Sequence, residues 1–134
     1  MSYVVDASVG VAAARTGEPG HVESLRFLRR CLTQGQGLVH PPLFSIEVAA
    51  ALSRRGANAA VLQRYLAPLL ASPNRVAVLG PKAAERVVRV AIRYGLRGAD
   101  AVYVWLAERE SLPLVTLDRE HLDRYSGATK PGEA

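Results

Sequence analysis

The chain has 134 residues, of which 49% are hydrophobic and 22% charged, and this composition predicts one globular domain and excludes a disordered protein. Seventeen Lys and Arg residues against twelve Asp and Glu give a net charge of +5, which favours an anionic partner without identifying it. The single cysteine, Cys31, excludes an internal disulfide and a cysteine-based zinc site. Its leucine neighbours predict a buried structural thiol.

The sequence also carries no sign of a membrane segment. No apolar run approaches the roughly 18 residues that a membrane span needs, and the first residues lack the basic and apolar regions of a signal peptide. We therefore expect a cytoplasmic protein.

In chain order, short apolar strands alternate with helices. The expected strands cover residues 3–5, 38–40, 76–79 and 113–117. The expected helices cover residues 7–14, 21–33 and 43–55, a segment between Asn58 and Ser72, a segment that starts at Pro81 and ends at the bend between Gly95 and Gly98, residues 100–111, and residues 119–125. This alternation indicates a three-layer α/β/α fold around a central parallel sheet of four or five short strands.

The helix that starts at Pro81 has an apolar stripe at helical spacing. Val87, Val88, Ala91 and Ile92 follow this spacing, and we expect them to form the side of the helix that faces the core.

Three of the four aspartates occupy one kind of position. Asp6 follows the first expected strand, Asp118 follows the last, and Asp100 opens a helix. Groups just beyond the carboxyl ends of parallel strands gather along the ligand-binding edge of a sheet, so we expect Asp6 and Asp118 to lie close together. Each of the three also precedes a helix, where aspartate is a favoured N-cap, so position alone fits both capping and metal binding.

Glu47 lies within an almost wholly apolar helical stretch, residues 43–52. No basic side chain three or four residues away can pair with it. A carboxylate on a mostly buried helix has a raised pKa or is neutralised by a partner or a cation. We interpret Glu47 as a buried functional carboxylate, with a solvated residue at the helix edge as the alternative.

Four carboxylates at one edge of a sheet repel each other unless a cation is present. Oxygen ligands without cysteine or histidine favour Mg²⁺ or Mn²⁺ over zinc, as one or two ions. Such a site supports the hydrolysis of phosphodiester bonds by metal-activated water.

Four sequence blocks, in this order, span nearly the whole chain. They are VVDAS at 4–8, PLFSIEV at 42–48, GADAVY at 98–103 and LVTLD at 114–118. In these blocks the chain resembles PIN-domain proteins of the VapC toxin type, the ribonuclease half of bacterial and archaeal toxin–antitoxin pairs. The resemblance implies that the catalytic and metal-binding residues are the carboxylate quartet of Asp6, Glu47, Asp100 and Asp118.

The same resemblance implies a PIN-like fold, with residues 1–126 as the nuclease domain and 127–134 as a polar C-terminal tail, which we expect to be frayed. Ser8 and Thr116 match positions that often carry hydroxyls beside the metal. The resemblance further implies homodimers and a small VapB-like antitoxin whose C-terminal segment reaches into the acidic groove, often with an arginine.

Other acidic-site families fit the sequence less well. A haloacid-dehalogenase-like phosphatase needs a second aspartate two residues after the first, where this chain has Ser8. A response-regulator receiver needs paired acidic residues near its start and a lysine after a late strand, yet the only lysines are Lys82 and Lys130. No glycine-rich loop of the P-loop or Rossmann pattern is present.

Two weaker patterns involve basic residues. His121 is expected to be a surface histidine on a short exposed helix, with a role as general acid or ligand as the alternative. Arg86, Arg89, Arg93 and Arg97 follow steps of three and four and predict one basic helix face, which either is solvated or contacts RNA.

Together these patterns predict an endoribonuclease that depends on Mg²⁺ or Mn²⁺ and leaves 5′-phosphate and 3′-hydroxyl ends. The resemblance to VapC proteins implies that it is the toxin of a VapBC-type pair. One alternative is a PIN nuclease of RNA processing that has no antitoxin. The other is a PIN module that binds RNA or a protein without cutting.

Overall fold

The computed structural model describes residues 1–134. In chain order the elements are β1 (Ser2–Val5), α1 (Ala7–Ala14), α2 (His21–Gln34), β2 (Gly37–His40), α3 (Leu43–Ser53), α4 (Ala59–Leu70), β3 (Arg75–Val76), α5 (Pro81–Tyr94), α6 (Gly98–Glu110), β4 (Leu114–Val115), α7 (Arg119–Arg124), β5 (Ala128–Thr129) and the 3₁₀ turn η1 (Pro131–Glu133). Every expected helix and strand is present, although β3 and β4 are shorter than the sequence suggested.

The five strands form one sheet in the order β3-β2-β1-β4-β5, and every neighbouring pair is parallel. The apolar strand β1 lies at its centre, where Val4 pairs with Val39 of β2 and with Leu114 of β4. Because β1 and β4 are parallel neighbours, the residues that follow them leave the sheet at the same edge.

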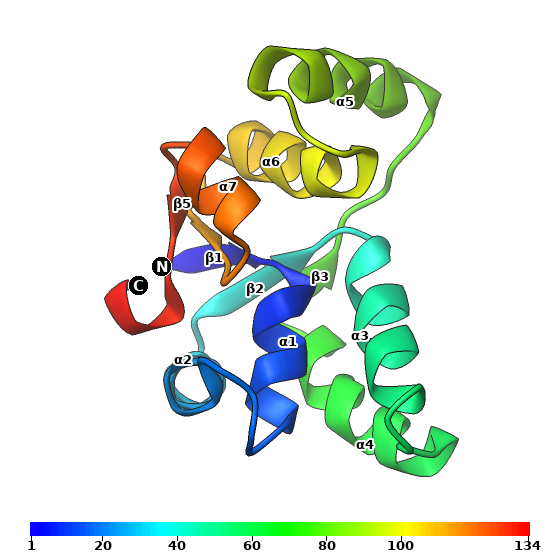
Figure 1. The fold of residues 1–134 in the computed structure, drawn as a ribbon, viewed down its shortest axis with the longest axis vertical. Helices are drawn as coiled ribbons and strands as arrows, with labels where there is room; N and C mark the ends of the chain where they lie inside the picture. The colour runs from blue at the N-terminus through cyan, green and yellow to red at the C-terminus, as the bar shows by residue number, and fades with distance from the viewer.

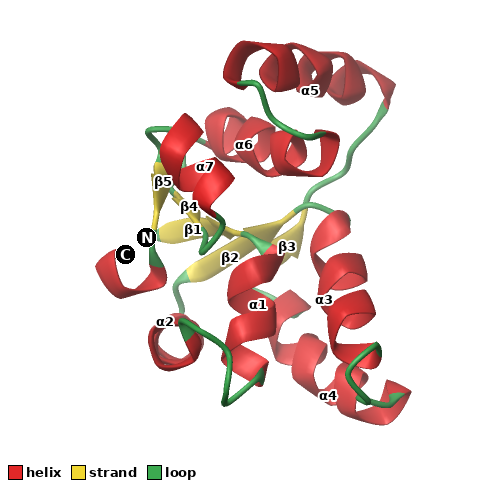
Figure 2. Ribbon diagram, in the orientation of Figure 1, coloured by secondary structure: helices red, strands yellow, loops and turns green.

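Helices cover both faces of the sheet, which confirms the three-layer α/β/α prediction. Helices α1 to α4 lie on one face, and α6 and α7 lie on the other (Figure 1). Helix α5 packs on α6 and lies outside these three layers, away from the strands (Figure 2).

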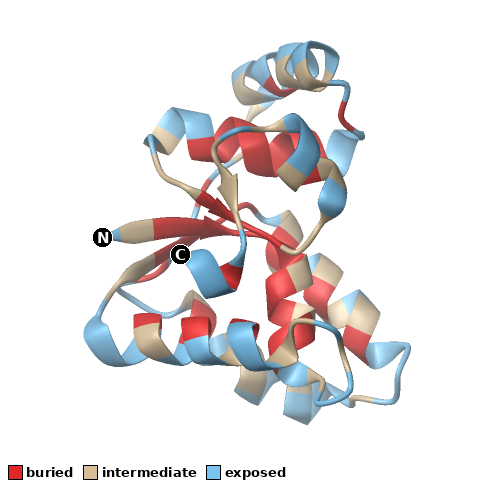
Figure 3. Cartoon of the chain, turned by 60° about the vertical axis from the view of Figure 1, so that its left-hand side comes forward, coloured by how far each residue is buried: buried red, intermediate tan, exposed pale blue.

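The hydrophobic core is formed largely by the central strands and by α6, which packs directly on them. Val4 and Val5 of β1 are fully buried, and every residue from Asp100 to Ala107 of α6 is buried (Figure 3). Helix α6 is buried on all sides because the sheet covers one side of it and α5 covers another. The sequence pattern of α6 is therefore apolar all round rather than amphipathic.

The close contact between α1 and α3 depends on one glycine. A Cβ atom at Gly10 would lie 2.9 Å from Cγ2 of Val48 and 3.1 Å from the ring of Phe44. The missing side chain lets α3 approach α1, and this approach brings Glu47 toward the carboxyl end of β1.

The predicted core face of α5 is partly wrong. Val87 is buried and Ala91 is half-buried, but Val88 and Ile92 are 58% and 77% exposed. Helix α5 packs mainly on α6, so only a narrow stripe of it is covered.

The expected fraying of residues 127–134 is also wrong. Ala128 and Thr129 form β5, which pairs with β4, and the Thr116 amide donates to the Thr129 carbonyl at 2.9 Å. Pro131 of η1 is buried, and η1 packs on α2. The expectation of fraying came from the polar composition of this segment, and composition does not show that its backbone pairs with β4.

Two further expectations concern Cys31 and membrane segments. Cys31 is fully buried, as predicted, and its burial raises the pKa of the thiol. None of the helices combines the length and the apolar character that crossing a membrane requires.

Candidate active site

Asp6 is the first residue after β1, and it both caps α1 and faces the site. Its Oδ2 accepts hydrogen bonds from the Ser8 amide at 3.3 Å, from the Ser8 hydroxyl and from the Thr116 hydroxyl at 3.1 Å. Burial raises the pKa of this carboxyl, and the charge of His121 and the Ser8 and Thr116 hydroxyls offset part of that shift. The capping and site interpretations of Asp6 are therefore compatible.

Asp118 occupies the matching position after β4. Its Oδ1 accepts from the Glu120 amide at 2.8 Å and so caps α7. The Thr116 hydroxyl oxygen accepts from the Asp118 amide at 3.0 Å, and the Ser8 hydroxyl oxygen accepts from the Leu117 amide at 3.0 Å. The Ser8 and Thr116 hydroxyls thus tie the turn after β1 to the turn after β4, next to the acidic side chains.

The sequence predicted that Asp100 is the first residue of its helix, and this prediction is wrong. The helix begins at Gly98, and its N-cap position is Arg97, which makes no side-chain capping bond. Asp100 is therefore the third residue of the first turn, where a carboxylate still interacts favourably with the helix dipole. Its carboxylate lies with those of the site, within 4.8 Å of a ligand atom of Asp118 and one of His121.

Glu47 comes from α3, on the opposite side of the sheet from α6. It is half-buried, less enclosed than predicted, and no basic side chain pairs with it. Its Oε1 accepts a hydrogen bond from the Tyr103 hydroxyl at 2.7 Å. Burial and the charges of Asp6 and Asp100 raise the pKa of this carboxyl, while the Tyr103 hydrogen bond offsets part of that shift.

These groups line a cavity of about 370 Å³. Its lining residues come from α1, α3 and α6 and the turns after β1 and β4, and Figure 1 shows where these elements lie. Its lining includes the whole carboxylate quartet together with Ser8, Arg54 and Arg97. Asp6 and Asp118, which are 112 positions apart in the sequence, therefore line the same cavity, as predicted from their positions after two parallel strands.

The donor set of this cavity fits a hard divalent cation. All four acidic side chains offer oxygen atoms, and two of the carboxyls, Asp6 and Glu47, have raised pKa values because burial disfavours their charge. Bringing a divalent cation among them would remove that penalty and the mutual repulsion together. Oxygen ligands of this kind suit Mg²⁺ and Mn²⁺ better than zinc.

His121 is not a surface residue, so that prediction is wrong. It is fully buried, with Nδ1 3.3 Å from the Thr116 hydroxyl oxygen and Nε2 3.1 Å from the Asp100 backbone carbonyl. A ring nitrogen of His121 lies within 4.8 Å of a carboxylate oxygen of Asp100 and of one of Asp118, so its alternative role as a metal ligand stays a prediction. The six-residue helix α7 is too short for hydrophobic periodicity to signal this burial.

Tyr103 is a site residue that sequence reasoning missed. It lies one turn after Asp100 on α6, is buried, and directs its hydroxyl to Glu47. The available signal was its spacing of three residues from Asp100, which places both side chains on one side of the helix.

The four arginines predicted to share a helix face do not do so. Helix α5 ends at Tyr94, and Gly95 adopts the left-handed conformation with φ of 64°, so the chain turns before Arg97. Arg86, Arg89 and Arg93 are exposed on α5. Arg97 instead contacts the quartet: its Nε lies 3.0 Å from Asp100 Oδ2 and its Nη2 lies 3.5 Å from Asp118 Oδ2.

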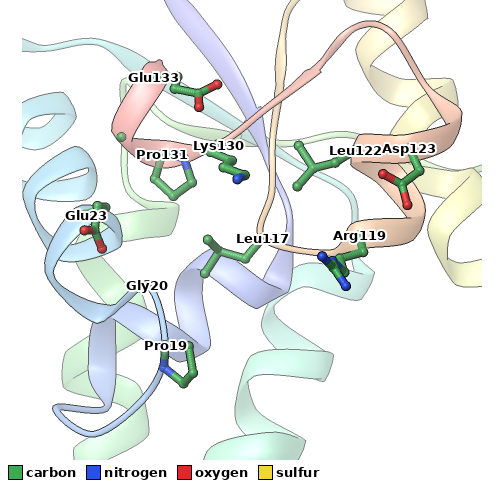
Figure 4. Close-up of a pocket in the computed structure, with 11 residues that line it drawn as sticks. Pro19, Gly20, Glu23, Leu117, Arg119, Leu122, Asp123, Lys130, Pro131 and Glu133 are labelled. Carbon is green, nitrogen blue, oxygen red and sulfur yellow. The ribbon is translucent and has the colours of Figure 1, made fainter.

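A second, larger cavity of about 740 Å³ lies between the loop before α2, helix α7 and η1 (Figure 4). Leu117 and Arg119 line it, although none of the quartet does. Its charged lining residues are Arg119, Lys130, Glu23, Asp123 and Glu133. Because the carboxylate quartet lines the smaller cavity and not this one, we place the candidate chemistry in the smaller acidic cavity.

Comparison with known proteins gives a family match over most of the chain. The model of the PIN domain family matches residues 3–128. A relative named exonuclease VapC9, from Pyrobaculum aerophilum, is 41% identical over 69 residues, which are 52% of this chain and 50% of the relative. The match thus spans about half the length of that relative.

Solved structures resemble the whole chain. The crystal structure of PAE2754 from Pyrobaculum aerophilum is 30% identical with a TM-score of 0.73, and the match covers 99% of this chain and 91% of that one. A toxin–antitoxin complex from Klebsiella pneumoniae matches at 18% identity and a TM-score of 0.70, over 96% and 97% of the two chains. VapC20 of Mycobacterium tuberculosis, described as a toxin that cleaves the sarcin–ricin loop, matches at 16% identity and a TM-score of 0.72, over 90% and 93%. At these lower identities the last two show a shared fold.

Proposed function

Because the chain belongs to the PIN domain family, we propose that it is an endoribonuclease that depends on Mg²⁺ or Mn²⁺ and acts as the toxin of a toxin–antitoxin pair. One observation carries this proposal: four carboxylates from α3, α6 and the turns after β1 and β4 line one cavity. A divalent ion held by Asp6, Glu47, Asp100 and Asp118 would supply an activated water and stabilise the charge on the leaving oxygen.

The protein's own part in this reaction is to hold the carboxylates in position. Hydroxyl groups of Ser8 and Thr116 orient Asp6, and the Glu120 amide orients Asp118. The Tyr103 hydroxyl orients Glu47. Each of the three acids keeps carboxylate lone pairs that these hydrogen bonds do not use, so positioning does not prevent metal binding.

The proposed substrate is RNA, and the charge distribution supports it. The quartet accounts for four of the twelve acidic residues, so the rest of the molecule is strongly basic with seventeen Lys and Arg. Arg86, Arg89 and Arg93 form an exposed basic stripe on α5, where phosphate contacts would be made.

Two partner proposals accompany the toxin role. The first is a small antitoxin, since the Klebsiella pneumoniae structure that shares this fold is a toxin–antitoxin complex. The second is a homodimer, supported by Val88 and Ile92, which lie one turn apart on α5 and expose apolar surface. A short upstream reading frame that encodes a small DNA-binding protein, whose product suppresses cleavage, would support the antitoxin.

The test is cleavage of RNA by the purified chain, with the ends of the products sequenced. We expect cleavage with Mg²⁺ or Mn²⁺, none with EDTA, and products with 5′-phosphate and 3′-hydroxyl ends. The matched control is Asp123→Asn, which removes the one aspartate outside the quartet and should cut normally, whereas Asp6→Asn should not cut. Cleavage that survives exhaustive chelation, or that only Zn²⁺ restores, would exclude this site. RNA binding without cleavage in every metal would indicate a non-cleaving PIN module.

A further inference from the structure

Arg97 is the only arginine or lysine that forms an ion pair with the carboxylate quartet. Its Nε donates to Asp100 Oδ2 at 3.0 Å, and its Nη2 lies 3.5 Å from Asp118 Oδ2. One guanidinium thus bridges two of the four acids, which come from different elements of the fold. The guanidinium therefore places a positive charge beside two of the carboxylates that are proposed to bind the divalent ion.

The backbone determines this position. Gly95 ends α5 in a left-handed conformation, Leu96 is buried, and Arg97 occupies the N-cap position of α6. The buried Leu96 and the start of α6 therefore hold the Arg97 Cα close to Asp100. The side chain itself is 72% exposed, so only its two ion pairs restrain it.

We propose that Arg97 exchanges between two anions: it holds Asp100 and Asp118 when no divalent ion is bound, and it is released to a phosphate of RNA when a divalent ion takes those carboxylates. This inference rests on the proposed metal-dependent ribonuclease function. It assigns to Arg97 a positioning role toward the substrate, distinct from that of the arginines on α5.

Charge explains why the exchange occurs. A guanidinium and a divalent cation repel each other and compete for the same carboxylate oxygens. Solvent screens the exposed Arg97 side of both ion pairs, although Asp100 is buried, so a divalent cation can displace the guanidinium. The long flexible side chain can then move without disturbing the fold. The planar fork of arginine also matches phosphate oxygens in a bidentate manner, so the released group has a second anionic partner of suitable geometry at the same rim.

The first measurement is the affinity of Mn²⁺ for the protein without RNA, by calorimetry. Arg97→Gln removes the competing charge, so we expect Mn²⁺ to bind about threefold to tenfold more tightly than to wild type. The matched control is Arg64→Gln on α4, an exposed arginine without an ion pair, which should bind Mn²⁺ as wild type does. Arg97→Lys keeps a charge at the site and should fall between the two.

The second measurement is cleavage of a short single-stranded RNA at saturating Mn²⁺. We expect Arg97→Gln to raise KM severalfold with a smaller effect on kcat, because it loses a phosphate contact and keeps the quartet. Equal or weaker Mn²⁺ binding by Arg97→Gln would overturn the exchange, and so would tighter Mn²⁺ binding with an unchanged KM. Failure of the proposed function is a separate result, since wild type would then neither bind Mn²⁺ nor cut RNA.

Discussion

Replacing Asp100 by asparagine separates a metal ligand from a structural residue. Ligand atoms of Asp100 and Asp118 are no more than 4.8 Å apart, and two unit charges at that distance repel by roughly 3 kcal/mol at an effective dielectric constant near 20. The bridging arginine and the solvent above Asp118 reduce this repulsion, so we expect about 1 kcal/mol to remain. Asparagine removes the repulsion, and its amide oxygen can still accept the hydrogen bond from Arg97.

In EDTA, the Asp100→Asn variant should therefore melt at the wild-type temperature or up to about 3 °C above it. Adding Mn²⁺ to a hundred times its dissociation constant should stabilise wild type by about 2.7 kcal/mol, or roughly 8 °C, and the variant by much less. The assay is a thermal melt with and without Mn²⁺, alongside RNA cleavage, which the variant should lose.

The matched control is Asp123→Asn on α7, an exposed aspartate outside the acidic cavity. It removes the same charge and should gain as much stability from Mn²⁺ as wild type does. If Asp100→Asn instead loses equal stability with and without Mn²⁺ and still cuts RNA, Asp100 is structural and the metal-site reasoning is refuted.

Three other predictions test the electrostatics, the packing and the RNA surface. Burial raises the pKa values of Asp6 and Glu47, so the folded protein binds their protons more tightly than the unfolded chain does, and stability in EDTA should fall as pH rises from about 4 through the raised pKa values. Denaturant melts across that pH range should show a shallower fall in stability for Glu47→Gln than for wild type, and identical slopes for the two proteins would contradict this prediction. Gly10→Val should destabilise the protein by about 1–3 kcal/mol in a denaturant melt by forcing α1 away from Val48, whereas Gly17→Ala, with open space around it, should have little effect. RNA affinity should fall steeply between about 50 and 200 mM salt, and a constant dissociation constant over that range would argue against arginine contacts to phosphate.

The strands and the positions of two acids could be predicted from the sequence because both depend on short-range pattern. Apolar runs bounded by Asp6 and Asp118 indicate buried parallel strands, and parallel strands place the residues after them at one edge. Glu47 could be singled out because a carboxylate without a basic partner is rare in an apolar helix. The structure brings these residues to one cavity, and their catalytic role remains a prediction.

Tertiary structure decided the features that depend on what packs against a residue. His121 lies in a helix too short for periodicity, yet it is fully buried between Thr116 and α6. Val88 of α5 fits an apolar stripe but is exposed, because α5 packs mainly on α6 and Val88 lies outside that contact. Residues 128–129 look like a polar tail but pair with β4. Arg97 fits the spacing of a basic helix face, but a turn at Gly95 carries it to the acids. In each case the local pattern was compatible with several environments, and contacts with residues distant in the sequence selected one.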